Sequence, residues 1–385
     1  MRFLLALCLF FSLNVHAQSP STIALPELGT PSAPPVSAKA YIVRDYASGK
    51  VLLNFNASQR IDPASMTKLM TAYLAFAAIA QGRLKLDQTI PISQKAYRAE
   101  GSRMFVEPNK PVNVDELLHG MIIQSGNDAS IALAEAVAGS EEGFAELMTR
   151  QAAKLGMKNS NFMNSTGLPD PKHFSSAEDL SILAAAIIRD FPQFYKYYSI
   201  KEYRYNGITQ PNRNRLLWLD PYVDGMKTGH TEAAGYCLVT SAKRGSMRLI
   251  SVIAGAPSDY ARATESQKLL NYAFQFWETQ KLYDANQELA KVQVWKGKQN
   301  IVKVGTPQAH FVTLPRGQYK QLKATLMTNQ PLIAPLQTGQ PVGKMRIELG
   351  GKVLGEYPVV ALETVPGANF IKRALDSIKL AWRKT

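Results

Sequence analysis

Ser65 and Lys68 are the two residues of this sequence whose types and spacing most clearly suggest chemistry. They lie in Asp62-Pro63-Ala64-Ser65-Met66-Thr67-Lys68, directly ahead of a run of apolar residues. We expect Asp62 to be the N-cap of a helix and Pro63 to be its first residue. Because residues three apart on a helix share a face, the lysine amine can reach the serine hydroxyl. A serine beside an amine that can lose its proton is a nucleophile with its own base.

Two further motifs follow this pair. They are Ser125-Gly126-Asn127 and Lys227-Thr228-Gly229. A lone Ser-x-x-Lys carries little information because it fixes only two residues, but the chain has no other Ser-x-x-Lys and no other Lys-Thr-Gly. The ordered set is that of penicillin-binding proteins and class A β-lactamases. The sequence therefore predicts a serine enzyme that forms an acyl intermediate.

The segments around the first two motifs are expected to mix β and α structure. Two β-rich runs, 40–45 and 51–54, flank a Gly-containing turn and predict a hairpin that leads toward Ser65. Apolar periodicity predicts a helical subdomain with helices at 114–123, 129–138, 142–155, 177–189 and 191–198. Ser125 and Asn127 would then lie on a connection between two helices, which can point polar groups into a cleft. An ordinary helix–helix turn would contain Ser-Gly-Asn just as readily.

Strands return around the third motif. Runs at 223–230, 235–242 and 248–255 predict an antiparallel series, and a helix is expected at 262–281. The period-2 rule puts Lys227 and Gly229 on one face of their strand. The missing side chain of Gly229 would let a substrate backbone pair along this edge. The predicted fold class is α+β, with helices packed around an antiparallel sheet.

The motifs and their flanks resemble those of low-molecular-mass penicillin-binding proteins, the serine-type D-alanyl-D-alanine carboxypeptidases of peptidase family S11. The likeness spans nearly all of the chain after residue 17. It rests on Pro63-Ala64-Ser65-Met66-Thr67-Lys68-Leu69-Met70, Gln124-Ser125-Gly126-Asn127-Asp128-Ala129 and Asp224-Gly225-Met226-Lys227-Thr228-Gly229-His230-Thr231. The resemblance implies a β-lactamase/transpeptidase-like domain at 38–283 and a small β-sandwich domain at 284–365.

The resemblance also implies roles for single residues. Ser65 would be the nucleophile, Lys68 its base, Ser125 a proton carrier to the leaving amine and Asn127 a partner of Lys68 and of the substrate amide. Backbone N–H groups of Ser65 and His230 would hold the oxyanion. The substrate-binding residues would be Lys227, Thr228, Gly229, His230 and Arg262. The flanks of Arg262 match the family less closely, so an ordinary surface arginine remains the alternative at that position.

The implied substrate is a peptidoglycan stem peptide that ends in D-Ala-D-Ala, and β-lactam antibiotics are the implied covalent inhibitors. No cofactor is expected. The five histidines, at positions 16, 119, 173, 230 and 310, lack the spacing of metal ligands, and the chain has no Gly-rich phosphate loop.

The N-terminus and the charge indicate an exported protein. Residues 1–17 have a lone Arg2, an apolar run and a small-residue cleavage site, which is typical of a signal peptide; an uncleaved anchor is the alternative. Residues 18–37 contain five prolines and predict a linker. The mature chain keeps only Cys237, which excludes an internal disulfide. We therefore expect the net charge of +14 to favour contact with anionic phospholipid or envelope polymer in the periplasm, and not with nucleic acid.

The C-terminal part changes character. Alternating runs at 292–295, 309–314, 322–327, 343–349 and 357–362 predict the all-β domain. Residues 366–385 then predict an amphipathic helix with an apolar face (Phe370, Ile371, Ala374, Leu375, Ile378, Trp382) and a basic one. Because it is too short to span a bilayer, we expect it to attach the protein peripherally to the outer face of the inner membrane. The alternative is a terminal helix packed on the β domain.

Two other functional classes remain open from the sequence. A class A-like β-lactamase shares the three motifs, but it would need a deacylating glutamate between the second and third, and no Glu-x-x-Leu-Asn occurs there. An envelope-binding protein without activity is the other alternative. The intact Ser65, Lys68 and Lys227 argue against it.

Overall fold

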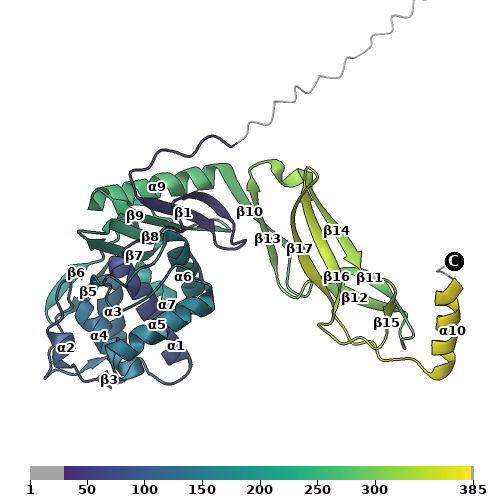
Figure 1. The fold of residues 1–385 in the computed structure, drawn as a ribbon, viewed down its shortest axis with the longest axis horizontal. Coiled ribbons are helices and arrows are strands. Elements are labelled where there is room, and N and C mark those ends of the chain that lie inside the picture. Colours follow the sequence, from purple (N-terminus) through teal and green to yellow (C-terminus); the bar gives the residue numbers. More distant parts are fainter. Residues whose placement is uncertain (1–29, 383–385) are drawn as a thin grey trace, which may run out of the picture. The chain divides into compact units, whose positions relative to one another are not determined.

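The structure is a computed structural model that describes residues 30–382 (Figure 1). The predicted signal peptide at 1–17 and linker residues 18–29 lie outside the described residues. Residues 30–39 contain neither helix nor strand, and β1 (Ala40–Asp45) and β2 (Val51–Phe55) then form the predicted antiparallel hairpin.

A five-stranded antiparallel sheet is the framework of the first domain. Its order is β2-β1-β9-β8-β7. The three strands predicted around the third motif are β7 (Val223–Thr231), β8 (Gly235–Arg244) and β9 (Met247–Ala256). Alternate residues of β9 enter two different cores, Val252 on one face and Ile253 on the other. Both faces are therefore covered, and β7 forms one edge.

Helices cover the two faces of this sheet (Figure 1). One face packs against α9 (Asp259–Phe276) and the other against α6 (Ala177–Asp190). The subdomain around α6 contains α1 (Lys68–Ala80), α2 (Gln94–Tyr97), α3 (Val114–Ile123), α4 (Asn127–Ala138), α5 (Glu141–Leu155) and α7 (Pro192–Tyr195), with the 3₁₀ helices η1 (Ala64–Thr67) and η2 (Lys196–Ser199). Two small hairpins complete it: β3 (Thr89–Ile90) with β4 (Val112–Asn113), and β5 (Glu202–Tyr205) with β6 (Ile208–Pro211). The short helix α8 (Leu216–Leu219) contributes Leu216 and Leu217 to the core on the α9 side.

The helix expected at 262–281 ends earlier than predicted. α9 stops at Phe276, and β10 (Trp277–Tyr283) follows it directly. β10 pairs antiparallel with β13 (His310–Pro315), so that Trp277 lies opposite Pro315. A partner 38 residues away in the chain overrides the local helical pattern, because each strand residue gains ladder hydrogen bonds there.

The second domain is all-β, as predicted. Its six-stranded sheet has the order β14-β16-β17-β12-β11-β15. The strands are β11 (Glu288–Trp295), β12 (Ile301–Gly305), β14 (Leu322–Thr328), β15 (Leu332–Ile333), β16 (Pro341–Leu349) and β17 (Lys352–Ala361), and η3 (Gln318–Gln321) precedes β14. β12 and β15 were not among the predicted runs. Apolar side chains such as Val302, Ile347 and Val359 form its separate core.

The chain described here ends in α10 (Phe370–Trp382). Asp376, the buried residue of this helix, accepts a hydrogen bond from the Lys296 N–H at 2.7 Å, and the Lys372 amine donates to the carbonyl of Gly297 at 2.6 Å. The apolar side chains point elsewhere, since Phe370 is 85% and Trp382 79% exposed. Within residues 30–382, no helix combines the length and the hydrophobicity that crossing a bilayer requires.

Candidate active site

Ser65 lies in the single 3₁₀ turn η1, and Lys68 is the first residue of α1. The Asp62 carboxylate accepts the Ala64 N–H at 2.8 Å, but the N-cap of η1 is Pro63, one residue later than predicted, and α1 itself begins only at Lys68. Side chains at i and i+3 eclipse in a 3₁₀ helix. The turn therefore brings the Lys68 amine to 2.9 Å from the Ser65 hydroxyl.

Three oxygen atoms surround the Lys68 amine. Besides Ser65 Oγ, they are Asn127 Oδ1 at 2.6 Å and the carbonyl oxygen of Thr166 at 2.7 Å. The two carbonyl-type oxygens can only accept hydrogen bonds. A neutral amine would use its two N–H bonds on them and would keep its lone pair for the Ser65 proton.

The surroundings of Lys68 favour this neutral form. Burial, with a smaller effect of the Arg213 charge, lowers the pKa of the Lys68 amine from 10.5 to about 7, against the opposing effect of Asp128 and Glu141. The side chain is 1% exposed. An amine that titrates near pH 7 is well matched to general-base catalysis.

The carbonyl of Thr166 belongs to a loop that passes close to the nucleophile turn. Gly167 has φ +84°, and a Cβ atom at this position would lie 1.8 Å from the carbonyl oxygen of Ala64. Only glycine satisfies both conditions. The sequence had suggested no role for this loop, because its contribution to the site is a backbone carbonyl that no residue type reveals.

The second motif comes from the junction of α3 and α4. Ser125 has the left-handed φ of +62°, and Asn127 is the first residue of α4, whereas we had expected it on the connection. The Asn127 amide nitrogen donates to the carbonyl of Glu100 at 2.6 Å, which fixes its oxygen toward Lys68. Non-glycine residues with this φ are uncommon and often belong to functional sites.

The third motif lies on the edge strand β7. The Lys227 amine donates to Ser125 Oγ at 2.8 Å. Its burial and the neighbouring cations Lys68, Arg213 and Arg262 hold the pKa of Lys227 well below its usual value. Ser65, Lys68 and Asn127 thus form one hydrogen-bonded group, and Ser125 and Lys227 form a second one.

Gly229 has a different geometric role from the one expected. A Cβ atom here would lie 3.0 Å from the carbonyl oxygen of Pro63 and 3.2 Å from Ala64 Cβ. The missing side chain therefore lets the nucleophile turn approach β7. Pairing of a substrate with β7 would depend on the free edge of the sheet and not on this space.

A cavity of about 300 Å³ opens onto these residues. Six of the nine predicted site residues line it: Ser65, Ser125, Thr228, Gly229, His230 and Arg262. Lys68, Asn127 and Lys227 are buried behind its wall. The His230 ring lies against the Tyr236 ring, with 4.1 Å between centroids.

Arg262 lies in the wall of this cavity and not on the open surface. It is 6% exposed, donates to the carbonyl of Gly229 at 3.2 Å and forms a salt bridge with Asp259. Four further lining residues, Ser102, Arg213, Tyr236 and Asp259, were missed by the sequence analysis. Arg213 lies in Asn-Arg-Asn, a polar segment without a motif, so only the fold brings it to the site.

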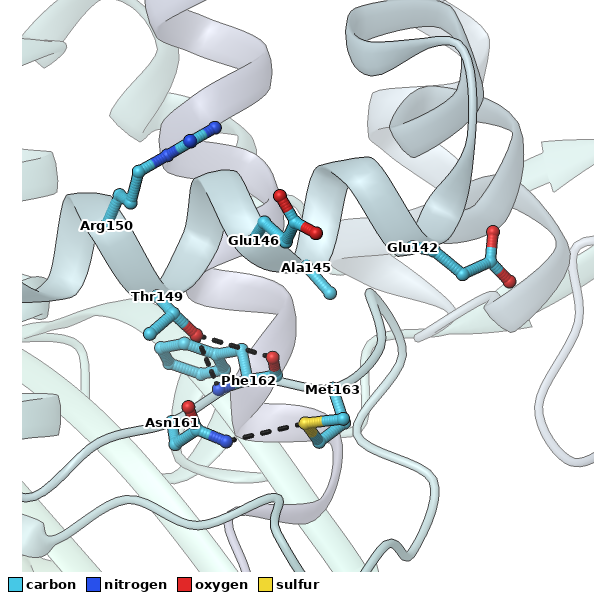
Figure 2. A pocket seen from close by; sticks show the side chains of 8 residues that line it. All are labelled: Glu142, Ala145, Glu146, Thr149, Arg150, Asn161, Phe162 and Met163. Atoms are coloured by element: carbon cyan, nitrogen blue, oxygen red, sulfur yellow. Dashed lines mark hydrogen bonds between the residues drawn. The ribbon is translucent and has the colours of Figure 1, made fainter.

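A larger cavity of about 490 Å³ lies between α5 and residues 161–163. Figure 2 shows Glu142, Glu146 and Arg150 on the helix and the Thr149 hydroxyl bonded to the backbone of Phe162. None of the predicted site residues lines it. The catalytic groups therefore identify the smaller cavity as the candidate active site.

This geometry fits one class of protein, the serine hydrolases, here with a buried lysine beside the serine, in an α+β domain that precedes an all-β domain. A model of the D-alanyl-D-alanine carboxypeptidase family matches residues 28–258, and a model described as penicillin-binding protein 5, C-terminal domain, matches residues 277–367. The chain belongs to the D-alanyl-D-alanine carboxypeptidase family.

Individual relatives agree. The chain is 44% identical to D-alanyl-D-alanine carboxypeptidase DacC of Escherichia coli (strain K12), over 92% of this chain and 91% of that one. It is 40% identical to DacA of the same organism, over 97% and 94%. Penicillin-binding protein 5 from Haemophilus influenzae has a similar solved structure, with a TM-score of 0.84, 42% identity and coverage of 87% and 99%. Penicillin-binding protein D2 from Listeria monocytogenes, solved with ampicillin bound, matches with a TM-score of 0.59, 29% identity and coverage of 63% and 100%.

Proposed function

We propose that this enzyme removes the terminal D-alanine from peptidoglycan stem pentapeptides through an acyl-enzyme on Ser65, and that it thereby limits cross-linking of the cell wall. The observation that carries the proposal is the Lys68 amine, buried and 2.9 Å from the Ser65 hydroxyl. Penicillins would acylate the same serine, since a β-lactam offers the same nucleophile a reactive amide.

Acylation would proceed in two proton transfers. Ser65 Oγ attacks the carbonyl between the two D-alanines while its proton moves to Lys68. Ser125, 2.8 Å from Lys227, then gives its proton to the departing amine as the C–N bond breaks and takes up the proton that Lys68 received, so that Lys68 is neutral again. Backbone N–H groups of Ser65 and His230 would hold the oxyanion. Losing one such donor typically costs about a hundredfold or more in rate.

Recognition of the substrate would use its terminal carboxylate. Thr228 offers a hydroxyl in the cavity wall, Lys227 supplies donor groups behind it, and Arg262 presents a guanidinium. A planar guanidinium suits a carboxylate because two N–H bonds can be made in parallel. The remaining stem peptide would lie along β7, an edge strand of its sheet.

The contacts of Glu141 argue against a fast β-lactamase. This buried carboxylate accepts the N–H and the hydroxyl of Ser165 at 3.0 and 2.7 Å and also pairs with Lys95. Its two contacts with Ser165 hold the loop that supplies the Thr166 carbonyl. With this glutamate engaged, we expect a penicilloyl-enzyme to be long-lived.

The location and the domain plan belong to the same proposal. We infer export to the periplasm by a signal peptide at 1–17, a linker at 18–37, a catalytic domain at 38–283 and a β-sandwich at 284–365. Residues 366–385 would attach the enzyme to the outer face of the inner membrane. The exposed apolar side chains of α10 support this attachment, because Asp376 and Lys372 already connect the opposite face to the β domain.

One experiment tests the activity. Mature protein is incubated with a labelled penicillin and, separately, with a peptide ending in D-Ala-D-Ala. We expect slow covalent labelling and release of D-alanine, both absent in Ser65→Ala. Rapid turnover of penicillin would indicate a β-lactamase instead, and failure of both reactions would indicate a binding protein.

A further inference from the structure

The catalytic cavity does not end at Arg262. A second cavity of about 470 Å³ shares three lining residues with it: Arg213, Asp259 and Arg262. Ser65 lines the first cavity but not the second. The second cavity therefore extends from the end of the cleft where the substrate carboxylate would bind.

The charge of this extension is unbalanced. Arg213, Arg215 and Arg262 line it together with a single carboxylate, Asp259. Asp259 pairs with both Arg215 and Arg262, whereas Arg213 forms no salt bridge with any residue between 30 and 382. Three guanidinium groups beside one carboxylate leave a formal charge of +2.

The walls are built from groups held in place by the fold. Asn212 is 6% exposed, and its side chain bonds to the backbone of Ile200 at 2.9 Å and of Asn214 at 2.9 Å. Gln210 donates to the carbonyl of Arg103 at 3.0 Å. The Trp218 side chain, on the short helix α8, is 49% exposed and contributes an apolar surface. A side chain entering the cavity would thus meet a preformed surface.

We propose that this second cavity is a leaving-group subsite that accepts a C-terminal D-amino acid with a carboxylate side chain in place of D-alanine. The inference rests on the proposed function, in which Thr228 and Arg262 bind the main-chain carboxylate of the terminal residue. That carboxylate reduces the formal charge of the extension from +2 to +1. A carboxylate on the side chain neutralises the remainder.

The order of the chemical steps determines which kinetic constant this preference for an acidic leaving group changes. Ser65 forms the same ester with the penultimate D-alanine whichever residue departs, and the released amine takes up the proton. Hydrolysis of that ester by water is therefore identical for all leaving groups. The subsite acts before the ester forms, so it changes kcat/KM and leaves a deacylation-limited kcat unaltered.

Three peptides that differ only in the last residue test this. They end in D-Ala-D-Ala, D-Ala-D-Glu and D-Ala-D-Gln, and release of the terminal amino acid is measured with the full mature chain. D-Gln has the shape of D-Glu without its charge. We expect kcat/KM for D-Glu to exceed that for D-Gln by about three- to tenfold at low salt, because pairs of this exposure are individually weak. The ratio should fall toward one in 0.5 M NaCl.

Two variants complete the experiment. Arg215→Gln should reduce the D-Glu to D-Gln ratio by about half or more, whereas Arg83→Gln, an exposed arginine bonded to the Gln81 side chain, makes the same change in net charge and should leave the ratio intact. Equal cleavage of D-Glu and D-Gln by the wild type, or an unchanged ratio in Arg215→Gln, would overturn the subsite. Failure to cleave even the D-Ala peptide would overturn the proposed function and the subsite with it.

Discussion

The Lys68 amine lies 2.7 Å from the carbonyl oxygen of Thr166, a residue 98 positions further along the chain. This contact gives the amine a second hydrogen-bond acceptor besides Asn127. Because a neutral amine has only two N–H bonds, both are then used, and the nitrogen lone pair of Lys68 faces the Ser65 hydroxyl. In the proposed mechanism, the orientation of Lys68 as the base therefore depends on a backbone carbonyl of this loop.

Lys68 should control the pH dependence of acylation. Its pKa of about 7 means that the neutral base is lost as the pH falls below that value. The second-order rate of labelling by a fluorescent penicillin should therefore rise tenfold per pH unit below pH 7 and level off above it. A rate independent of pH between 5.5 and 8 would contradict the assignment of Lys68 as the base.

Asn127→Asp should shift this profile. A carboxylate in contact with the amine stabilises its protonated form and raises the pKa of Lys68, so the midpoint should move up by about one unit or more. Asn127→Ser removes the acceptor without adding charge. It should slow acylation with a midpoint at or below that of the wild type. The measurement is the difference between the midpoints, which should be higher in Asn127→Asp than in Asn127→Ser; identical midpoints would count against electrostatic control.

Gly167→Ala should displace the loop that bears Thr166. The added Cβ would lie 1.8 Å from the Ala64 carbonyl oxygen, and the φ of +84° is strained for alanine. We expect a loss of at least a hundredfold in acylation rate and a clear loss of stability. Gly156→Ala is the matched control, since its φ of +83° is the same but nothing lies within 4 Å of the new Cβ. It should cost about 1 kcal/mol of stability and leave acylation unchanged.

The periodic parts of the fold were predictable from the sequence. The hairpin β1–β2 and the strands β7 to β9 follow β-rich runs bounded by turn residues, and helix α3 follows the apolar periodicity of a helix. The end of α9 was not predictable in this way. The strand that begins at Trp277 depends on Pro315, and no local pattern contains a pairing over that distance.

The same distinction applies to the site. Five residues carry their chemistry in side chains of recognisable spacing, and the structure joins them by hydrogen bonds into two groups: Ser65, Lys68 and Asn127 in one, Ser125 and Lys227 in the other. The Thr166 carbonyl and the Arg213 guanidinium have no such spacing. We expected the missing side chain of Gly229 to leave room for the substrate. A sequence shows that a side chain is missing, but it does not show which neighbouring group needs that space.

His173 connects the same loop to the nucleophile turn, and this connection should make stability depend on pH. Its Nδ1 atom accepts the Met163 N–H at 3.2 Å, so Nε2 carries the proton and donates to the Thr67 hydroxyl at 2.9 Å. Burial lowers the pKa of His173 from 6.5 to about 4, against the opposing effect of Asp62 and Asp170. Between these two values the unfolded chain binds the proton and the folded chain does not. The free energy of unfolding should therefore fall as the pH drops from about 6.5 to about 4.

His173→Gln isolates this effect, because glutamine keeps a donor for Thr67 and does not titrate. Between pH 7.5 and pH 5, urea unfolding of the wild type should lose about 2 kcal/mol more than unfolding of the variant. Equal losses in both proteins would show that His173 is not the titrating group.

The apolar face of α10 should govern attachment to membranes. Leu375 is 53% exposed, and its transfer into the lipid interface contributes about 2 kcal/mol, so Leu375→Glu should weaken binding to anionic vesicles at least tenfold. Ser377→Glu adds the same charge at an exposed position whose side chain bonds to the backbone of Arg373, and it should weaken binding much less. Deleting residues 367–385 should abolish sedimentation with the vesicles. If the truncated and full-length proteins sedimented equally, the attachment would have to come from another surface, and the exposed side chains of α10 would need a different partner.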